Sequence, residues 1–159
     1  MALQFLQNSM SGGQTILNQH DVGAVVLACI DFRFRSDLPN AIQTAFGIDG
    51  YDEIKLAGGA KNLSRPGKPG RQETVLDDIG LALGAHHAHT ILLLNHQNCG
   101  KYASEGHSFP SQDEERSFHL SELRTAGTTA RAHFPTATIL LGYTYVDDAD
   151  AVRIERIPF

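Results

Sequence analysis

Three long apolar segments constrain the fold of this chain more than any other feature. They cover residues 23–30, 89–96 and 136–146, are rich in aliphatic and β-branched residues, and contain no Asp, Glu, Lys or Arg. Continuous apolar runs of this length are typical of strands that are buried on both faces of a sheet. A weaker fourth candidate, residues 52–59, alternates apolar residues with polar or small ones. These segments predict a sheet that is covered on both sides.

Segments with helical spacing lie between the predicted strands. Residues 37–47, 71–87 and 112–134 carry apolar residues at positions that share one helix face. Because strands and helices alternate along the chain, we expect an α/β fold: a mostly parallel sheet of about four strands, flanked by helices and joined by right-handed crossovers. Residues 151–157 follow a turn and predict a short antiparallel edge strand at the C-terminal end.

The length of the chain indicates a single domain over residues 1–159, with one linker-like stretch at 64–71 and a further candidate helix within 1–18. The formal net charge is −5 and there is no extended basic stripe, which argues against nucleic acid or an anionic membrane as partner. No segment approaches the ~20 apolar residues of a membrane span, and the N-terminus lacks the features of a signal peptide. We therefore expect a soluble, cytoplasmic protein.

Polar residues follow two of the predicted strands at the point where each strand ends. Cys29, Asp31 and Arg33 follow the first, and His96 and Cys99 follow the segment at 89–96. In an open parallel sheet, the carboxyl ends of neighbouring strands face one crevice, which is where ligands bind. These five side chains are therefore expected to converge.

Two thiolates and one imidazole form a set of three protein ligands for Zn²⁺, which leaves the fourth position for water or a nearby carboxylate. This pattern is typical of catalytic zinc sites, since structural sites usually close with four Cys or His ligands. Asp31 and Arg33 lie one residue apart on the same side of an extended segment and can pair. Asp31 could then orient a water on zinc or become the fourth ligand. The alternatives for Cys29 and Cys99 are inert buried thiols or a disulfide.

These motifs resemble those of the β-class carbonic anhydrases, which carry Cys-x-Asp-x-Arg and, later, His-x-x-Cys followed by Gly. The resemblance covers nearly the whole chain, including the order of the strands. It departs from the family pattern at Lys55-Leu56, where many members have Arg-Asn, and at Gln97-Asn98, where small or hydroxylated residues are usual. The matching residues are Cys29, Asp31, Arg33, His96, Cys99 and Gly100.

The resemblance implies zinc-dependent, reversible hydration of CO₂ to bicarbonate and a proton by hydroxide generated on the zinc. It also implies Cys29, His96 and Cys99 as ligands, Asp31 and Arg33 as catalytic residues, and an active site near the interface of a homodimer or higher homo-oligomer. Two alternatives stay open: the same site acting on carbonyl sulfide or carbon disulfide, and a zinc-binding structural or regulatory protein without turnover. A nucleotide-binding protein is weaker, since no phosphate-binding glycine loop follows any strand.

Other candidates have structural interpretations beside the functional ones. Histidines at the end of the helix at 71–87 suggest a second metal site or a helix end, and the segment after Cys99 suggests a proton relay or a solvated loop. The glycine-rich stretch 56–62 suggests an anion site or a tight turn. Of the phenylalanines, we expect core positions, with one lining a substrate pocket. The helix-end histidines are His86, His87 and His89. The relay candidates after Cys99 are Glu105 and His107, and the phenylalanines are Phe32, Phe34 and Phe46.

Overall fold

The structure is a computed structural model and describes residues 16–159. It begins with a short 3₁₀ turn at Ile16–Asn18. The helix predicted within residues 1–18 therefore falls almost entirely outside the described residues. No helix among residues 16–159 combines the length and apolar character that crossing a bilayer requires.

The described residues form a five-stranded sheet in the order β2-β1-β3-β4-β5. The first four strands in this order are mutually parallel, and β5 pairs antiparallel with β4. This confirms the predicted α/β fold with its antiparallel C-terminal edge, and the weak candidate at 52–59 is a strand that ends at Lys55. The strands are β1 (Ala24–Ala28), β2 (Tyr51–Lys55), β3 (Thr90–His96), β4 (Thr138–Val146) and β5 (Val152–Ile157).

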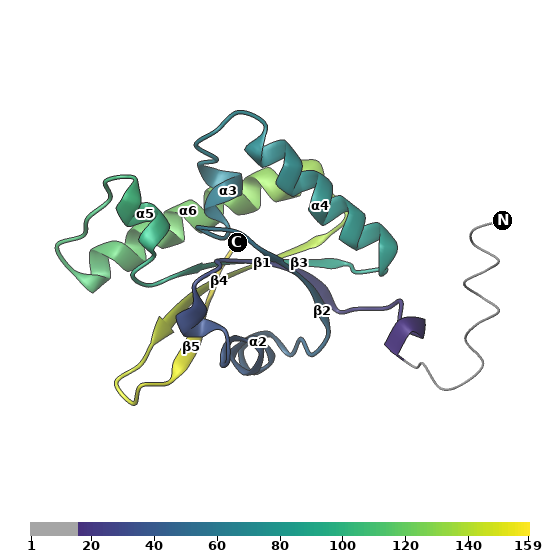
Figure 1. Cartoon of the computed structure of the whole chain (residues 1–159), viewed down its shortest axis with the longest axis horizontal. Helices are drawn as coiled ribbons and strands as arrows, with labels where there is room; N and C mark the ends of the chain where they lie inside the picture. Colours follow the sequence, from purple (N-terminus) through teal and green to yellow (C-terminus); the bar gives the residue numbers. More distant parts are fainter. Residues whose placement is uncertain (1–15) are drawn as a thin grey trace.

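Helices cover both faces of the sheet, as Figure 1 shows. The long helices α4 and α6 lie over one face together with the short α3 and α5, and α2 lies against the other face. The helices α2, α4 and α6 fall where the helical spacing predicts them. The helices are α2 (Leu38–Phe46), α3 (Lys61–Ser64), α4 (Arg71–Ala85), α5 (Gly100–Ser104) and α6 (Gln112–His133), and a 3₁₀ turn η2 spans Phe32–Phe34.

Successive residues of the central strands pack into two different hydrophobic clusters, one on each face of the sheet. In β1, Val25 and Leu27 belong to the cluster under α4 and α6, whereas Val26 and Ala28 belong to the cluster under α2. Every residue of β1 is buried. Burial on both faces is the physical reason why β1 and β3 appear in the sequence as unbroken apolar runs.

A glycine turn after β2 packs against the ends of β1 and β3. Gly59 has a φ of +53°, and a Cβ at this position would lie 2.4 Å from the carbonyl oxygen of Leu94 and 3.0 Å from the backbone nitrogen of Cys29. Only glycine fits both the backbone conformation and the space. The stretch 56–62 is therefore a tight turn that brings its backbone to the carboxyl ends of the central strands.

Candidate metal centre

The side chains of Cys29, His96 and Cys99 converge at the carboxyl end of the sheet. Cys29 follows β1, His96 ends β3, and Cys99 is the N-cap of α5. The two sulfur atoms and a ring nitrogen of His96 all lie within 4.8 Å of one another. His96 and Cys99 are buried and Cys29 is partly buried. Both cysteines are free thiols, since their sulfur atoms are 4.0 Å apart, about twice the length of a disulfide bond.

The two ring nitrogens of His96 have different surroundings. Nδ1 lies 2.8 Å from the carbonyl oxygen of Gln97, to which an Nδ1–H donates. This contact leaves the lone pair of Nε2 free, and Nε2 is buried without a hydrogen-bond partner. A buried polar atom without a partner calls for an explanation. A metal ion between Nε2 and the two sulfur atoms supplies one, because metal-bound imidazoles usually donate their second N–H to a backbone carbonyl.

The pKa values of the two thiols are shifted in opposite directions. The hydrogen bond from Cys99 lowers the pKa of Cys29 to about 4, helped by His96 and by the backbone N–H of Gly58, 3.3 Å from the sulfur, while burial opposes the shift. The same contact and burial raise the pKa of Cys99. A cation bound between the two sulfur atoms would displace their protons. The Gly58 N–H thus donates to the Cys29 sulfur and is not free for an anion.

Asp31 and Arg33 form a two-pronged ion pair beside the three ligands. Arg33 Nε donates to Asp31 Oδ1 at 2.9 Å and Arg33 Nη2 donates to Oδ2 at 2.6 Å, and these bonds lower the pKa of Asp31 to about 2. Asp31 Oδ2 lies 3.8 Å from His96 Nε2, but the carboxylate is not part of the group of mutually close ligand atoms. This placement favours Asp31 as a neighbour of an open fourth position.

Arg33 also connects the two sequence motifs. Its Nη2 donates to the backbone carbonyl oxygen of Asn98 at 2.9 Å, and Asn98 lies between His96 and Cys99. One guanidinium group therefore fixes both the Asp31 carboxylate and the turn that leads to Cys99. Planar, five-donor guanidinium is suited to such multiple contacts, whereas a lysine is not.

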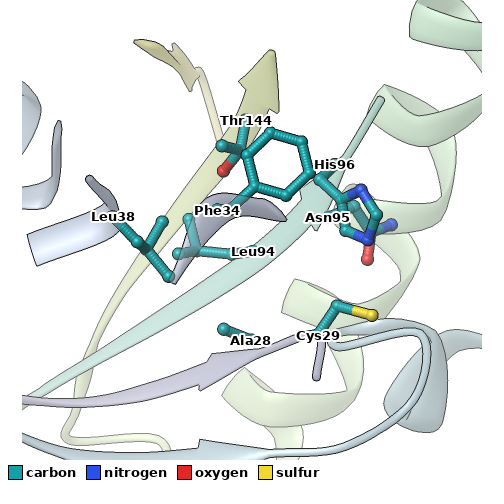
Figure 2. A pocket seen from close by; sticks show the side chains of 8 residues that line it. All are labelled: Ala28, Cys29, Phe34, Leu38, Leu94, Asn95, His96 and Thr144. Atoms are coloured by element: carbon teal, nitrogen blue, oxygen red, sulfur yellow. The ribbon is translucent and has the colours of Figure 1, made fainter. Parts of the chain in front are cut away.

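A small apolar pocket adjoins Cys29 and His96 (Figure 2). Its cavity volume is about 10 Å³, which is about the room that one water-sized molecule needs. The ring of Phe34 stands 4.8 Å from the ring of His96, so Phe34 is the pocket phenylalanine, whereas Phe32 is 82% exposed and Phe46 packs against the core under α2. The lining residues are Ala28, Cys29, Phe34, Leu38, Leu94, Asn95, His96 and Thr144.

The motifs did not indicate Thr144 or Asn95 as lining residues. Thr144 is the register partner of His96 in the parallel β3–β4 pair. Its position next to the site could be inferred only once the pairing of these strands was known, because no local pattern distinguishes it from the other residues of β4.

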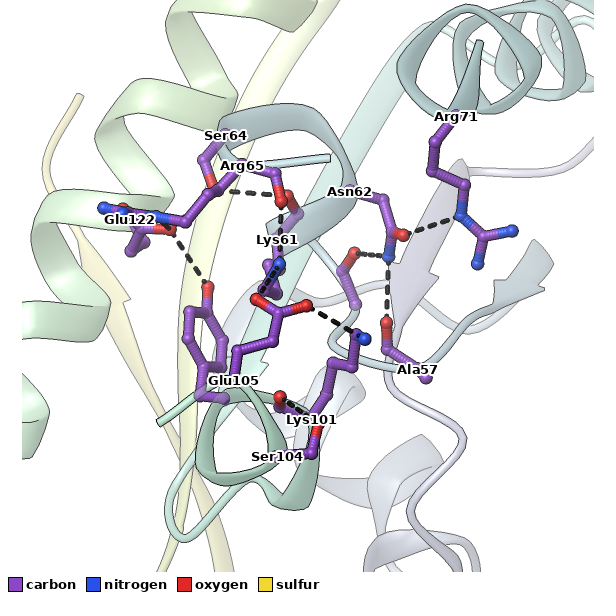
Figure 3. A network of polar contacts seen from close by, with 12 residues as sticks. Ala57, Lys61, Asn62, Ser64, Arg65, Arg71, Lys101, Ser104, Glu105 and Glu122 are labelled. Atoms are coloured by element: carbon purple, nitrogen blue, oxygen red, sulfur yellow. Dashed lines mark hydrogen bonds and ion pairs between the residues drawn. The ribbon is translucent and has the colours of Figure 1, made fainter. Parts of the chain in front are cut away.

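An ion pair between buried Lys61 and the more exposed Glu105 joins the glycine turn's helix to α5 (Figure 3). Lys61 is 1% exposed, and its Nζ lies 2.6 Å from Glu105 Oε2 and donates to the Arg65 carbonyl oxygen at 2.8 Å. Glu105 also pairs with Lys101 at 2.9 Å, and the two lysines lower its pKa. Glu105 therefore stays anionic and joins α3 to α5, which does not suit a proton relay.

A second polar group attaches α6 to this network. Glu122 is buried on α6, and its Oε2 accepts hydrogen bonds from Ser64 Oγ at 2.9 Å and from the Tyr102 hydroxyl at 3.3 Å. Arg65 Nη2 donates to Glu122 Oε1 at 3.1 Å. Arg65 thus holds the start of the linker-like stretch 64–71 against α6.

The histidines near the end of α4 do not form a metal site among the described residues. His86 Nδ1 lies 2.7 Å from Asp52 Oδ2, and His87 Nδ1 lies 3.1 Å from Asp21 Oδ1. Within residues 16–159, Cys29, His96 and Cys99 form the one group of three or more candidate ligands. Carboxylates, in place of the expected helix-end carbonyls, are thus the partners of His86 and His87.

Comparison with known proteins decides the family. A family model described as "Putative carbonic anhydrase" matches residues 19–155. The chain belongs to this carbonic anhydrase family. The resemblance recognised from the two motifs is thereby confirmed.

The relatives and solved structures that the chain resembles are distant in sequence. Uncharacterised proteins of Rickettsia bellii (strain RML369-C) and Rickettsia conorii (strain ATCC VR-613 / Malish 7) are 23% identical over 140 residues and 22% identical over 152 residues. These matches span 87% and 90% of this chain, and 83% and 80% of the relatives. The crystal structure of β-carbonic anhydrase isoform I from Trichomonas vaginalis superposes with a TM-score of 0.53 at 12% identity, over 99% of this chain and 94% of that one. The shared fold is that of the β-carbonic anhydrases.

Proposed function

We propose that this member of the carbonic anhydrase family binds one Zn²⁺ through Cys29, His96 and Cys99 and catalyses the reversible hydration of CO₂ to bicarbonate and a proton. The observation that carries the proposal is the convergence of two sulfur atoms and a ring nitrogen of His96 within 4.8 Å, with His96 Nε2 unpartnered, beside an apolar pocket. Two thiolates and an imidazole suit zinc, and three protein ligands leave a position open for a reactant.

Zinc held there supplies a Lewis acid that lowers the pKa of water toward neutrality. Asp31 is the group that orients the attacking water: Arg33 keeps it ionised, so its free lone pairs accept a hydrogen bond from that water. The 3.8 Å separation of Asp31 Oδ2 from His96 Nε2 puts this acceptor next to the ligand atoms. Orientation matters here because two thiolates donate charge and work against acidification of water.

The pocket favours CO₂ over larger heteroallenes. Its volume of about 10 Å³ and its walls of Phe34, Leu38 and Leu94 suit a small apolar molecule. Carbon disulfide replaces both oxygen atoms with larger sulfur atoms and is therefore the poorer match to these walls. We expect the hydration rate to fall from CO₂ to carbonyl sulfide to carbon disulfide, and comparison of steady-state rates on the three substrates tests this order.

We also propose that the chain acts as a homodimer of single-domain subunits in the cytoplasm. Ile30 and Phe32, on either side of Asp31, are 60% and 82% exposed, and large exposed apolar side chains next to an active site favour a covering partner. We propose that a second copy of the chain is this covering partner. Two free thiols 4.0 Å apart favour a reducing compartment, where they stay available for zinc.

Stopped-flow hydration of CO₂ on zinc-counted protein tests the proposed activity. Cys99→Ser is expected to lose both zinc and turnover, since one of three ligands is gone.

Asp31→Asn is expected to keep zinc and to lose about 10–100-fold in kcat/KM, because an amide cannot replace the charged acceptor. Asp37→Asn, at an exposed helix start without a side-chain cap, is the matched control and should resemble wild type. Full zinc occupancy without hydration across the neutral pH range would favour a non-catalytic zinc protein.

A further inference from the structure

The turn between His96 and Cys99 contains a residue in the left-handed backbone conformation. Asn98 has a φ of +54°, a left-handed conformation that asparagine adopts more readily than most other non-glycine residues. Gln97 is fixed to β4, since its N–H donates to the Thr144 carbonyl oxygen at 2.9 Å and its side-chain Oε1 accepts from the Val146 N–H at 3.2 Å. Asn98 lies between Gln97 and Cys99, so the position of its backbone determines where the Cys99 sulfur lies.

Charged side chains hold the backbone of Asn98 from both sides. Arg33 Nη2 donates to its carbonyl oxygen at 2.9 Å, and its N–H donates to Glu115 Oε1 at 2.6 Å. Hydrogen bonds to ionised groups are shorter and stronger than those between neutral groups. Arg33 belongs to the motif at the end of β1, whereas Glu115 comes from α6 and belongs to neither motif.

The first turn of α6 fixes the position of the Glu115 side chain. Glu115 is 9% exposed and lies in the first turn of α6, where its N–H donates to the Ser111 carbonyl oxygen at 3.1 Å. The Ser111 side chain caps the same turn by accepting from the Glu114 N–H. One turn further along, His119 Nε2 lies 3.7 Å from Glu115 Oε1. A 22-residue helix that packs against β3 and β4 therefore sets the position of this acceptor.

Loss of the carboxylate is expected to act on the metal centre more than on the fold. A cavity of about 430 Å³ borders Asn98, Cys99 and Glu115. Water can occupy the space that a shortened side chain leaves and can accept the Asn98 N–H, so that this donor does not become unsatisfied. Water, unlike a helix-bound carboxylate, does not fix the position of the turn.

We propose that Glu115 is a positioning residue of the metal centre: by accepting the Asn98 N–H it fixes the turn so that Cys99 Sγ and His96 Nε2 meet at one point. This inference rests on the proposed zinc binding. Outer hydrogen-bond partners of metal ligands typically contribute 10–100-fold to metal affinity. Glu115 is assigned a role of that kind, and it acts through the backbone of Asn98 without touching the metal or the substrate.

The test measures zinc affinity, by competition with a chromogenic chelator, for the full chain and three variants. Glu115→Ala should bind zinc about 10–100-fold more weakly. Glu115→Gln should lie between Glu115→Ala and wild type, because the amide oxygen still accepts but without charge. Glu114→Ala removes an exposed carboxylate from the same helical turn and should match wild type. Thermal unfolding of the metal-free proteins reports on folding separately, and the absorption spectrum of the Co²⁺-loaded proteins should change only in the Glu115 variants.

Each outcome decides a specific point. Wild-type zinc affinity in Glu115→Ala, or an equal loss in Glu114→Ala, overturns the role of Glu115. If Glu115→Ala does not fold, wild-type affinity in Glu115→Gln overturns it. Zinc binding by the wild-type chain without CO₂ hydration would end the proposed function while the affinities still decide the role of Glu115. Absence of zinc binding by the wild-type chain would overturn both.

Discussion

His96 and His119 are both buried histidines, and their surroundings assign them different roles. His96 donates from Nδ1 to a backbone carbonyl, its Nε2 has no hydrogen-bond partner, and its ring lies beside two sulfur atoms. His119 is fully buried, neither of its nitrogens has a hydrogen-bond partner, and its ring packs 4.8 Å from Tyr102 and 5.5 Å from Tyr143. His119 therefore behaves as an aromatic core residue that must remain neutral.

Burial of His119 predicts a pH-dependent loss of stability. Burial lowers the pKa of His119 from 6.5 to about 4, so the neutral form is favoured in the folded state. Its contribution is complete above pH 6.5 and is lost as the pH falls toward 4. The shift corresponds to roughly 3 kcal/mol. We expect metal-free His119→Phe to lose less free energy of unfolding than wild type over this interval, as measured by urea unfolding. An equal loss in both proteins would contradict this assignment.

The sequence could identify the residues of the candidate centre but not all of their contacts. Cys29, His96 and Cys99 stood out because their residue types and their places at strand ends are informative without any coordinates. The contact between Asn98 and Glu115 joins two segments 17 positions apart across a loop, and neither residue is unusual in its local sequence. The pairing of buried Lys61 with Glu105 was not predicted for the same reason, since lysine is ordinarily a surface residue.

At the scale of elements, the glycine turn after β2 determines how closely the backbone approaches the site. Gly58 and Gly59 both have positive φ, and the turn places the Gly58 N–H on the Cys29 sulfur. The long strands and helices were predictable because burial on both faces of a strand leaves an unbroken apolar run and burial of one helix face leaves a periodic pattern. The helices α3 and α5 were not, because one turn of helix is too short to show a period.

Gly59→Ala should therefore be far more disruptive than Gly47→Ala. Both glycines have positive φ, but a Cβ at Gly59 meets the Leu94 carbonyl oxygen at 2.4 Å, whereas a Cβ at Gly47 meets nothing within 4 Å. We expect Gly47→Ala to lower the free energy of unfolding by about 1–2 kcal/mol and Gly59→Ala by roughly 2–5 kcal/mol. Chemical denaturation of the two variants measures the difference. Equal losses would show that the close approach at Gly59 is not tight.

For the whole molecule, the candidate centre lies at the carboxyl end of the central strands, with helices covering both faces of the sheet (Figure 1). The strand order puts β1 beside β3, and this neighbour relation is what unites two motifs separated by more than sixty residues. The sequence predicted this architecture because alternating strands and helices admit few arrangements. It could not give the partners of exposed residues such as Ile30 and Phe32.

Exposed Phe32 provides a test of the proposed homodimer. Phe32→Ser removes a side chain that is 82% exposed and should shift the molecule from dimer toward monomer, as measured by light scattering over a range of concentrations. Leu81→Ser is the matched control, since Leu81 is 71% exposed on α4 and belongs to neither motif. A wild-type protein that is monomeric at all concentrations, or equal effects of both substitutions, would contradict the proposed interface.

The central claim is that Cys29, His96 and Cys99 form one metal centre on which CO₂ hydration depends. The most direct measurement is stopped-flow hydration on protein as purified, after removal of its metal with a chelator, and after return of one equivalent of Zn²⁺, with zinc counted in each sample. We predict one zinc per chain, loss of turnover with loss of zinc, and recovery of both together. Turnover that persists in the metal-free protein, or zinc that returns without turnover, would contradict it.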